Sequence, residues 1–107
     1  MDPNLDKVGW YCANAGITTH PVKGKQPNAW SVYDMHGNVC EWCWDLYDRY
    51  PPGPTTDPVG ASSGTDRANR GGYWYGGADA CRSASRGGGD PGYVNNFTGF
   101  RVARTAR

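Results

Sequence analysis

One stretch of this sequence carries most of its structural information: Asn28-Ala-Trp-Ser-Val-Tyr-Asp-Met-His-Gly-Asn-Val-Cys-Glu-Trp-Cys-Trp-Asp45. Gly and Asn tolerate the positive-φ backbone of a tight turn, so His36-Gly37-Asn38 predicts a turn. After it, residues 39–44 alternate between two sets of side chains with the two-residue period of a strand. A strand that leaves a turn inside an aromatic-rich segment predicts the centre of a core.

Seven large apolar side chains, four within this stretch and three further along the chain, are expected to be mostly buried. They are Trp30, Tyr33, Trp42, Trp44, Trp74, Phe100 and Val102. Glu41 lies among apolar neighbours, and a buried carboxylate needs a partner, for which Arg70, Arg82 and Arg101 are candidates. Together with Arg86, these arginines are expected to hold the fold through hydrogen bonds to loop carbonyls, because a guanidinium offers several donors in a fixed fork.

The length of 107 residues suits one domain with a modest core, so residues 1–107 are interpreted as a single domain. Sixteen Gly and eight Pro predict many turns, while five Trp and seven Tyr can fill a core with large rings. A formal net charge of +1 argues against nucleic acid as the main partner. The sequence shows no membrane-spanning apolar run and no signal segment, and it leaves the location open.

The local patterns predict short elements separated by long loops. A short helix is expected over Leu5–Tyr11, with Asn4 as its cap. Besides the strand after the turn, strands are expected at Arg67–Tyr75, Ala80–Arg86 and Phe100–Arg104. The Gly87-Gly88-Gly89 run is expected to be a loop or bend, and residues 16–27 and 50–65 are expected to be loops. The predicted class is α+β with short antiparallel strands and less than about a quarter helix.

Four cysteines, Cys12, Cys40, Cys43 and Cys81, allow three interpretations. Cys40 and Cys43 sit in an aromatic run, where a free thiol behaves as a small buried hydrophobe. A disulfide set is the second interpretation. The CxxC spacing suggests zinc or redox chemistry as the third, although a zinc site would need a second CxxC or paired His.

Residues 67–107 interleave two kinds of position. The first kind, which we call the frame, has residue types that are typical of strands. Its positions are Arg70-Gly71-Gly72, Trp74, Cys81-Arg82-Ser83-Ala84, Arg86, Pro91 and Gly99-Phe100-Arg101. We call the residues between them the filler positions: Tyr73, Tyr75, Gly76, Gly77, Ala80, Ser85, Gly87, Gly88, Gly89, Asp90, Gly92, Tyr93, Val94, Asn95, Asn96, Phe97 and Thr98. Tyr, Gly, Asn and Ser provide rigid amphipathic contact and adaptable hydrogen bonding in antibody loops. The hypothesis is one exposed binding face whose energy comes mainly from Tyr75, Tyr93 and Phe97.

A face of this kind should be decoupled from the core. Replacement by Ala is expected to cost within about 0.5 kcal/mol at three filler positions, Tyr93, Asn95 and Phe97. The same replacement is expected to cost about 3–5 kcal/mol at three frame or core positions, Trp42, Trp74 and Phe100.

Several segments together resemble a known family: Asn28–Asp45, Arg70-Gly-Gly, Cys81-Arg-Ser-Ala-Ser-Arg86 and Gly99-Phe-Arg-Val-Ala103. They are similar to the formylglycine-generating-enzyme, or sulfatase-modifying-factor, family, from about Leu5 to Arg104. The resemblance implies a C-type-lectin-like fold. The chain departs from the family pattern at Cys40, where the family usually has Trp. It also lacks the N-terminal part of a full family domain, which predicts a fold that is either minimal or a fragment.

The resemblance also implies where catalysis would take place. Enzymes of the family bind copper through a pair of cysteines just upstream of the Arg-rich strand. Here that region is Tyr75-Gly76-Gly77-Ala78-Asp79, without a thiol, and Cys81 falls within the strand. The expectation is therefore no catalytic residue, no cofactor and no enzymatic activity. A formylglycine-generating oxidase or an inactive relative is the alternative. For Asn38 and Glu41 themselves, the residues favour a structural role, and the alternative is a calcium site formed by oxygen ligands on a loop.

A second branch of the same fold suggests a different function, the variable proteins of diversity-generating retroelements. In these, template adenines are copied with errors, so Asn codons become codons that exclude Lys, Glu, Gln, Met and Trp. Every filler residue belongs to a permitted type. The resemblance implies a non-catalytic ligand-binding protein with residues 67–107 as its variable region and a protein or glycan as its target. An ordinary family member with a glycine-rich surface loop is the alternative, and the oligomeric state stays open.

Overall fold

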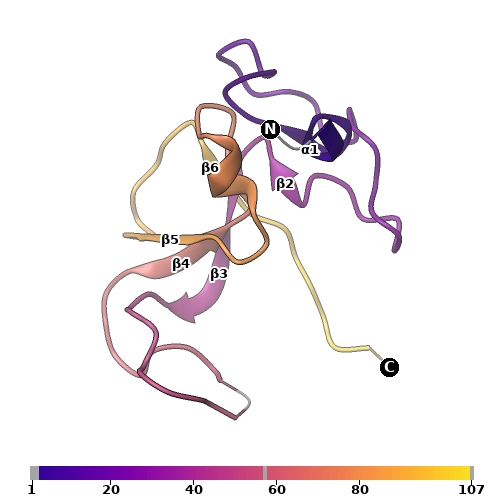
Figure 1. The fold of residues 1–107 in the computed structure, drawn as a ribbon. Helices are drawn as coiled ribbons and strands as arrows, with labels where there is room; N and C mark the ends of the chain where they lie inside the picture. Colours follow the sequence, from indigo (N-terminus) through magenta and orange to yellow (C-terminus); the bar gives the residue numbers. More distant parts are fainter. Residues whose placement is uncertain (1–2, 57, 107) are drawn as a thin grey trace.

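The computed structural model describes residues 3–56 and 58–106 (Figure 1). Its elements are α1 (Pro3–Val8), β1 (Gly9–Trp10), β2 (His36–Gly37), β3 (Cys40–Leu46), β4 (Arg67–Arg70), the 3-10 helix η1 (Ala78–Cys81), β5 (Arg86–Gly89) and β6 (Thr98–Gly99). Strands β1 and β2 form a small parallel sheet, and the larger sheet has the order β5-β4-β3-β6. The expected strand-rich class with little helix is confirmed, although β6 pairs with β3 in parallel rather than antiparallel fashion.

Strand β3 and the turn before it follow the prediction from the sequence. Gly37 and Asn38 have φ values of 79° and 71°, the positive-φ backbone that Gly and Asn tolerate. A Cβ on Gly37 would lie 2.8 Å from the backbone nitrogen and carbonyl carbon of Trp10. Only glycine therefore allows β2 to approach β1 this closely. The buried Asn38 side chain bonds both backbone groups of His20, at 3.0 Å and 2.8 Å.

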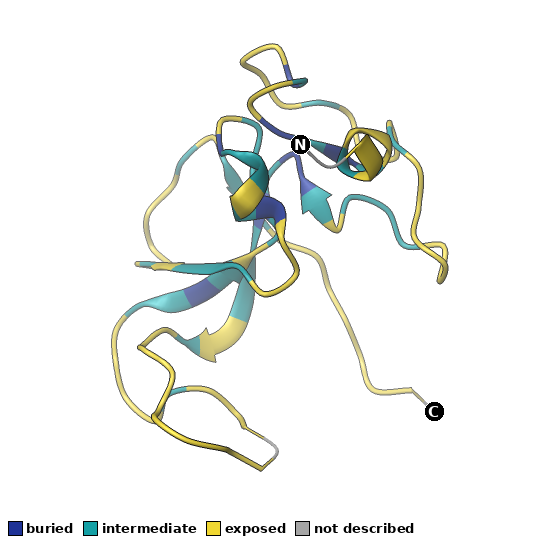
Figure 2. Cartoon of the chain, in the orientation of Figure 1, coloured by how far each residue is buried: buried dark blue, intermediate teal, exposed yellow. Residues whose placement is uncertain are grey.

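The fully buried core is small and built mostly from small side chains. It contains Tyr11, Ala15, Cys40, Ala68 and Cys81 (Figure 2). Of the side chains expected in the core, Tyr33, Trp42 and Trp74 are half-buried. The prediction is wrong for Trp30, Trp44, Phe100 and Val102, which are exposed.

Local structure explains these exposed side chains. Trp30 stands in a turn where the Asn28 side chain accepts hydrogen bonds from the backbone of Trp30 and Val32, both at 3.0 Å. Trp44 lies where the pairing of β3 with β4 becomes irregular. The Arg67 guanidinium stacks over its ring, 4.7 Å from the ring centre. Residues 100–106, which include Phe100 and Val102, follow β6 without regular structure and extend away from the sheet in Figure 1.

Several predicted boundaries are wrong for identifiable reasons. Helix α1 ends at Val8 instead of Tyr11 because Gly9 and Trp10 pair with β2. Asn4 lies inside this helix, which begins at Pro3, a residue suited to a first helical turn. Strand β4 ends at Arg70, before two glycines with positive φ. Residues 100–104 contain no strand, because the edge strand β6 ends at Gly99.

The segment 80–86, expected as a strand, forms the end of η1 and a turn instead. The Ser85 hydroxyl donates to the Asp79 carbonyl at 2.9 Å, and the Ser85 amide donates to the Arg82 carbonyl at 3.0 Å. Small polar residues of this kind compete with strand pairing by bonding nearby backbone. Pairing with β4 begins only at Arg86.

The glycine run, expected as a bend, is the strand β5. It pairs with β4 in antiparallel register from Arg86 to Gly89. A Cβ on Gly88 would overlap the Tyr47 ring and lie 2.7 Å from its Cβ, and one on Gly87 would lie 2.8 Å from Asn69 Oδ1. Glycine is used here because neighbouring side chains occupy the space beside the strand.

Arginines hold the loops to the sheet as expected, with one exception. Arg101 makes the predicted pair with Glu41, in which Nε and Nη2 each donate to a carboxylate oxygen at 2.7 Å. It also donates to the carbonyls of Tyr33 and Asp34, both at 2.9 Å, and the bonds to Glu41 raise the pKa of Arg101.

Two other arginines bind loop carbonyls. Arg70 donates to Ser83 at 3.1 Å, and Arg86 donates to the Asp48 carbonyl. Arg82 is exposed, and within the described residues it makes no hydrogen bond of this kind.

Candidate recognition face

The filler positions differ widely in exposure. The exposed ones are Tyr75, Gly88, Asp90, Gly92, Tyr93, Val94 and Asn96. The half-buried ones are Tyr73, Gly77, Ala80, Ser85, Gly87, Gly89, Asn95, Phe97 and Thr98, whereas Gly76 is buried. The expectation that all of them are exposed is therefore too broad.

Most filler positions nevertheless surround two adjoining hollows. The first, of about 260 Å³, is the loop hollow, lined by Trp42, Asn69, Gly88, Gly89, Asp90, Tyr93, Asn95, Phe97 and Thr98. The second, of about 240 Å³, is the strand hollow, and its filler positions are Tyr73, Ala80, Ser85, Gly87, Gly88 and Phe97. Both hollows share Asn69, Gly88 and Phe97, so they belong to one continuous surface.

The backbone of the loop between β5 and β6 is anchored to the frame. The Trp74 indole donates to the Asn96 carbonyl at 2.9 Å, and the Cys40 amide donates to the Phe97 carbonyl at 2.8 Å. Within the loop, the side chain of Asn95 accepts from the Phe97 amide at 3.0 Å. Fixed backbone with outward side chains such as Tyr93, 68% exposed, is an arrangement that suits recognition.

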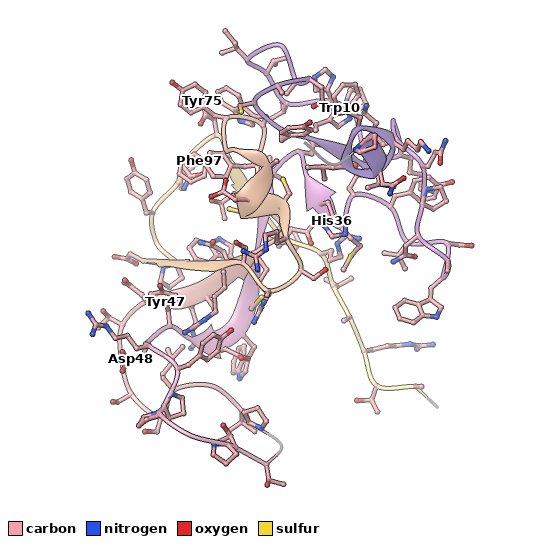
Figure 3. All side chains as sticks on the ribbon, viewed as in Figure 1. Trp10, His36, Tyr47, Asp48, Tyr75 and Phe97 are labelled. Atoms are coloured by element: carbon pink, nitrogen blue, oxygen red, sulfur yellow. The ribbon has the colours of Figure 1, made fainter. Side chains whose placement is uncertain are left out.

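The three aromatic residues expected to dominate binding differ in their surroundings. The Phe97 ring packs against Tyr73 with ring centres 4.9 Å apart, so only part of it is accessible. Tyr75 is exposed and stands edge-on to Trp74 at 5.5 Å. Figure 3 shows Tyr75 and Phe97 at the same end of the molecule, away from Tyr47 and Asp48.

Sequence reasoning missed two residues of this surface, Trp42 and Asn69. Trp42 was expected only as a core residue, yet it lines the loop hollow together with Asn69. A polar residue in the middle of a strand was the available signal for Asn69. For Trp42, the signal was its strand alternation, which places it on the same face of β3 as Cys40.

All four cysteines are free thiols; Cys40 and Cys81 are buried, and Cys43 is half-buried. Burial raises the pKa of Cys81 to about 11 and also raises the pKa values of Cys40 and Cys43. Cys40 donates to the Phe97 carbonyl at 3.2 Å, and Cys12 is exposed. Thiols with raised pKa values are poor nucleophiles at neutral pH.

The residues considered for calcium have structural roles. The Asn38 side chain is engaged by the His20 backbone, and the Glu41 carboxylate is engaged by Arg101. In residues 3–56 and 58–106, no three His, Cys, Asp or Glu side chains are grouped so that they could hold a metal ion.

Comparison with known proteins identifies the family. The family model described as "Sulfatase-modifying factor enzyme 1-like domain" matches residues 1–106. The chain belongs to this family. It is 41% identical over 90 residues to the serine/threonine-protein kinase pkn1 of Chlamydia caviae, covering 80% of this chain and 15% of that protein. It is 36% identical over 95 residues to the formylglycine-generating enzyme of Streptomyces coelicolor, covering 84% of this chain and 30% of the enzyme.

A solved structure is also similar, the Treponema denticola variable protein 1. It superposes with a TM-score of 0.85 and 40% identity, covering 94% of this chain and 37% of that protein. The sulfatase-modifying-factor-like chain thus has the C-type-lectin-like fold that its sequence implied. It spans less than a third of the two curated relatives' length and little more than a third of the variable protein.

Proposed function

We propose that this chain is the variable protein of a diversity-generating retroelement, which displays a diversified, non-catalytic ligand-binding face on a C-type-lectin-like scaffold. The observation that carries the proposal is the pair of adjoining hollows lined mainly by filler positions. The likeness to Treponema denticola variable protein 1 supports it. The ligand is a protein or a glycan.

The anchoring of the loop supports this role physically. Frame groups bind the loop through backbone carbonyls, such as that of Asn96, which are present whatever the side chain is. Side chains like Tyr93 and Val94 can then change without loss of these bonds.

The DNA around the gene tests the proposal. We expect a near-copy of the segment that encodes residues 67–107, with Asn codons at filler positions, beside a reverse-transcriptase gene. A gene without both features would contradict the proposal and favour an ordinary family member with a glycine-rich loop.

A second candidate is formylglycine-generating or related oxidase activity, because the Streptomyces coelicolor enzyme is 36% identical. The segment 75–79 offers no thiol for a copper pair, and the Cys81 thiol that follows it is buried with a raised pKa. We expect no turnover of a Cys-containing sulfatase peptide in the presence of copper. Measurable formylglycine in that peptide would establish the second candidate.

A further inference from the structure

The loop hollow has an aromatic lining with a single charge. Trp42 from β3 and Phe97 are half-buried, and Tyr93 projects beside them with 68% of its surface exposed. Among the residues that line this hollow, Asp90 is the one with a charged side chain. A cavity of about 260 Å³ can accept one side-chain-sized group, but not a large ligand.

The Asp90 carboxylate is held in place without being neutralised. Its Oδ1 accepts a hydrogen bond from the Gly92 amide at 2.8 Å, and the Asp90 carbonyl accepts from the Tyr93 amide at 3.0 Å. In the described part of the chain, the one ion pair joins Arg101 to Glu41, and Asp90 has no cationic partner. The negative charge therefore remains available beside the aromatic rings.

Two arginines of the larger sheet, one from β4 and one from β5, are engaged with other aromatic rings. The Arg67 guanidinium lies 4.7 Å from the centre of the Trp44 ring and donates to the Trp44 carbonyl. Arg86 lies 3.8 Å from the centre of the Tyr50 ring and 4.8 Å from that of Tyr47. Cations thus stack on aromatic rings elsewhere in this chain, whereas Trp42 lacks such a partner within the described residues.

Gly89 keeps the Trp42 ring accessible. A Cβ at this position would lie 3.4 Å from Cη2 of the indole. Any larger side chain would lie over the edge of the ring and reduce the hollow. The filler residue at position 89 therefore controls access to Trp42.

We infer that the loop hollow takes one cationic side chain, an arginine or a lysine, presented by a protein ligand. The inference rests on the proposed recognition function and assigns it a ligand chemistry. Cations are attracted to the faces of Trp, Tyr and Phe, and the Asp90 carboxylate adds charge complementarity. Arginine suits the site better because a planar guanidinium can stack and form hydrogen bonds at once.

The test uses Nα-acetyl-arginine methylamide as a probe, with its citrulline analogue as an uncharged match of the same shape. Both are titrated into the isotope-labelled domain while NMR follows the Trp42 indole signal. We expect the arginine probe to shift this signal with an affinity about tenfold or more above that of citrulline. Equal responses to both probes, or no response to arginine, would overturn the inference.

Two carboxylate variants locate the charge. Asp90→Asn removes the charge in the hollow and is expected to weaken the arginine probe about tenfold. Asp48→Asn is the matched control, since Asp48 is also exposed, its Oδ1 also accepts a local backbone bond at 2.7 Å, and it lies outside the hollow. Loss of binding in the control to the same degree would contradict the assignment.

The failure of this inference differs from a failure of the proposed function. A domain that ignores the arginine probe but captures a glycan from an array still has a recognition face, and only the cationic ligand is wrong. The variable-protein function is contradicted if the DNA around the gene has neither a near-copy of the segment that encodes residues 67–107 nor a reverse-transcriptase gene. This holds whatever the titration shows.

Discussion

Individual side chains of the candidate recognition face either project into solvent or pack against the sheet and its loops. Tyr93 has an outward ring, whereas Phe97 packs on Tyr73 and lines both hollows. Trp74 is half-buried and holds the loop through its indole, while Phe100 is exposed. The division into frame and filler positions therefore does not predict which aromatic side chains stabilise the fold. The contribution of each side chain follows from its own burial and contacts.

The first prediction is the order of the stability costs at these aromatic positions. Tyr93→Ala and Phe100→Ala should each change the free energy of unfolding by no more than about 0.5 kcal/mol, as at other surface sites. Phe97→Ala should cost about 1–3 kcal/mol because it removes a half-buried ring contact. Thermal melts of the three variants measure the costs. A Tyr93 cost equal to that of Phe97 would show that Tyr93 belongs to the core.

The second prediction concerns the buried thiol of Cys81. Its pKa is raised to about 11 by burial, so the folded state holds this proton more tightly than the unfolded state, whose thiol titrates near its ordinary value of about 8.5. The resulting stabilisation is complete below the unfolded pKa and is lost as the pH rises through the folded pKa. Melting temperature should therefore fall between about pH 8.5 and pH 11.

Two serine variants separate this thiol from other titrating groups. Cys81→Ser should flatten part of the alkaline decline because a serine hydroxyl does not titrate there. Cys12→Ser, at an exposed thiol, removes only a lesser cause of the raised Cys81 pKa and should therefore change the decline much less. Identical pH profiles for Cys81→Ser and the unmodified chain would refute this role of the buried thiol.

At the scale of elements, β5 is a strand whose sequence does not look like one. Glycine normally weakens a strand, yet Gly88 leaves the space that the Tyr47 ring occupies. The strand pairs with β4 along its whole length and so connects the filler positions before and after it to the sheet. The Tyr47 ring therefore limits the size of the side chain at position 88, within the proposed variable region.

The third prediction compares two glycines of this strand. Gly88→Ala should destabilise the fold by about 1–3 kcal/mol, the usual cost of overpacking. Gly89→Ala should cost much less, because its Cβ would reach only the Trp42 ring, at 3.4 Å. Urea unfolding of both variants measures the difference. Adding Tyr47→Ala to Gly88→Ala should recover part of the loss, and failure of this rescue would exclude the Tyr47 clash as its cause.

For the whole molecule, the notable property is how little of its aromatic surface is buried. Trp30 and Trp44 are 85% and 86% exposed, and residues 100–106 extend from the sheet without regular structure (Figure 1). Within the described residues, no helix has the length and apolar character needed to cross a membrane.

The fourth prediction uses tryptophan fluorescence to test this exposure. Iodide should quench the emission from Trp30 and Trp44 readily, and Trp44→Phe should remove much of the quenchable signal. Trp10→Phe is the control, because Trp10 is half-buried and stacked on His20 with ring centres 3.7 Å apart. Equal protection of all five tryptophans from iodide would mean that the exposed ones are covered in solution.

The sequence by itself determined the family, the strand β3, the turn before it and the need of Glu41 for an arginine. These features depend on local rules: the two-residue strand period, the positive φ of Gly37 and Asn38, and the cost of an unpaired carboxylate that is partly withdrawn from water. Most of the filler positions that the sequence distinguished from the frame by residue type line the two hollows.

Only the tertiary structure decided which aromatics are buried, that a glycine run pairs as a strand, and that Trp42 and Asn69 line the loop hollow. The exposure of Trp44 depends on where β4 stops pairing regularly with β3, and the glycine strand depends on the position of Tyr47. Both are contacts between residues distant in the sequence, and no local pattern encodes them. The sequence showed which residue types are present, and long-range packing decided which face each one occupies.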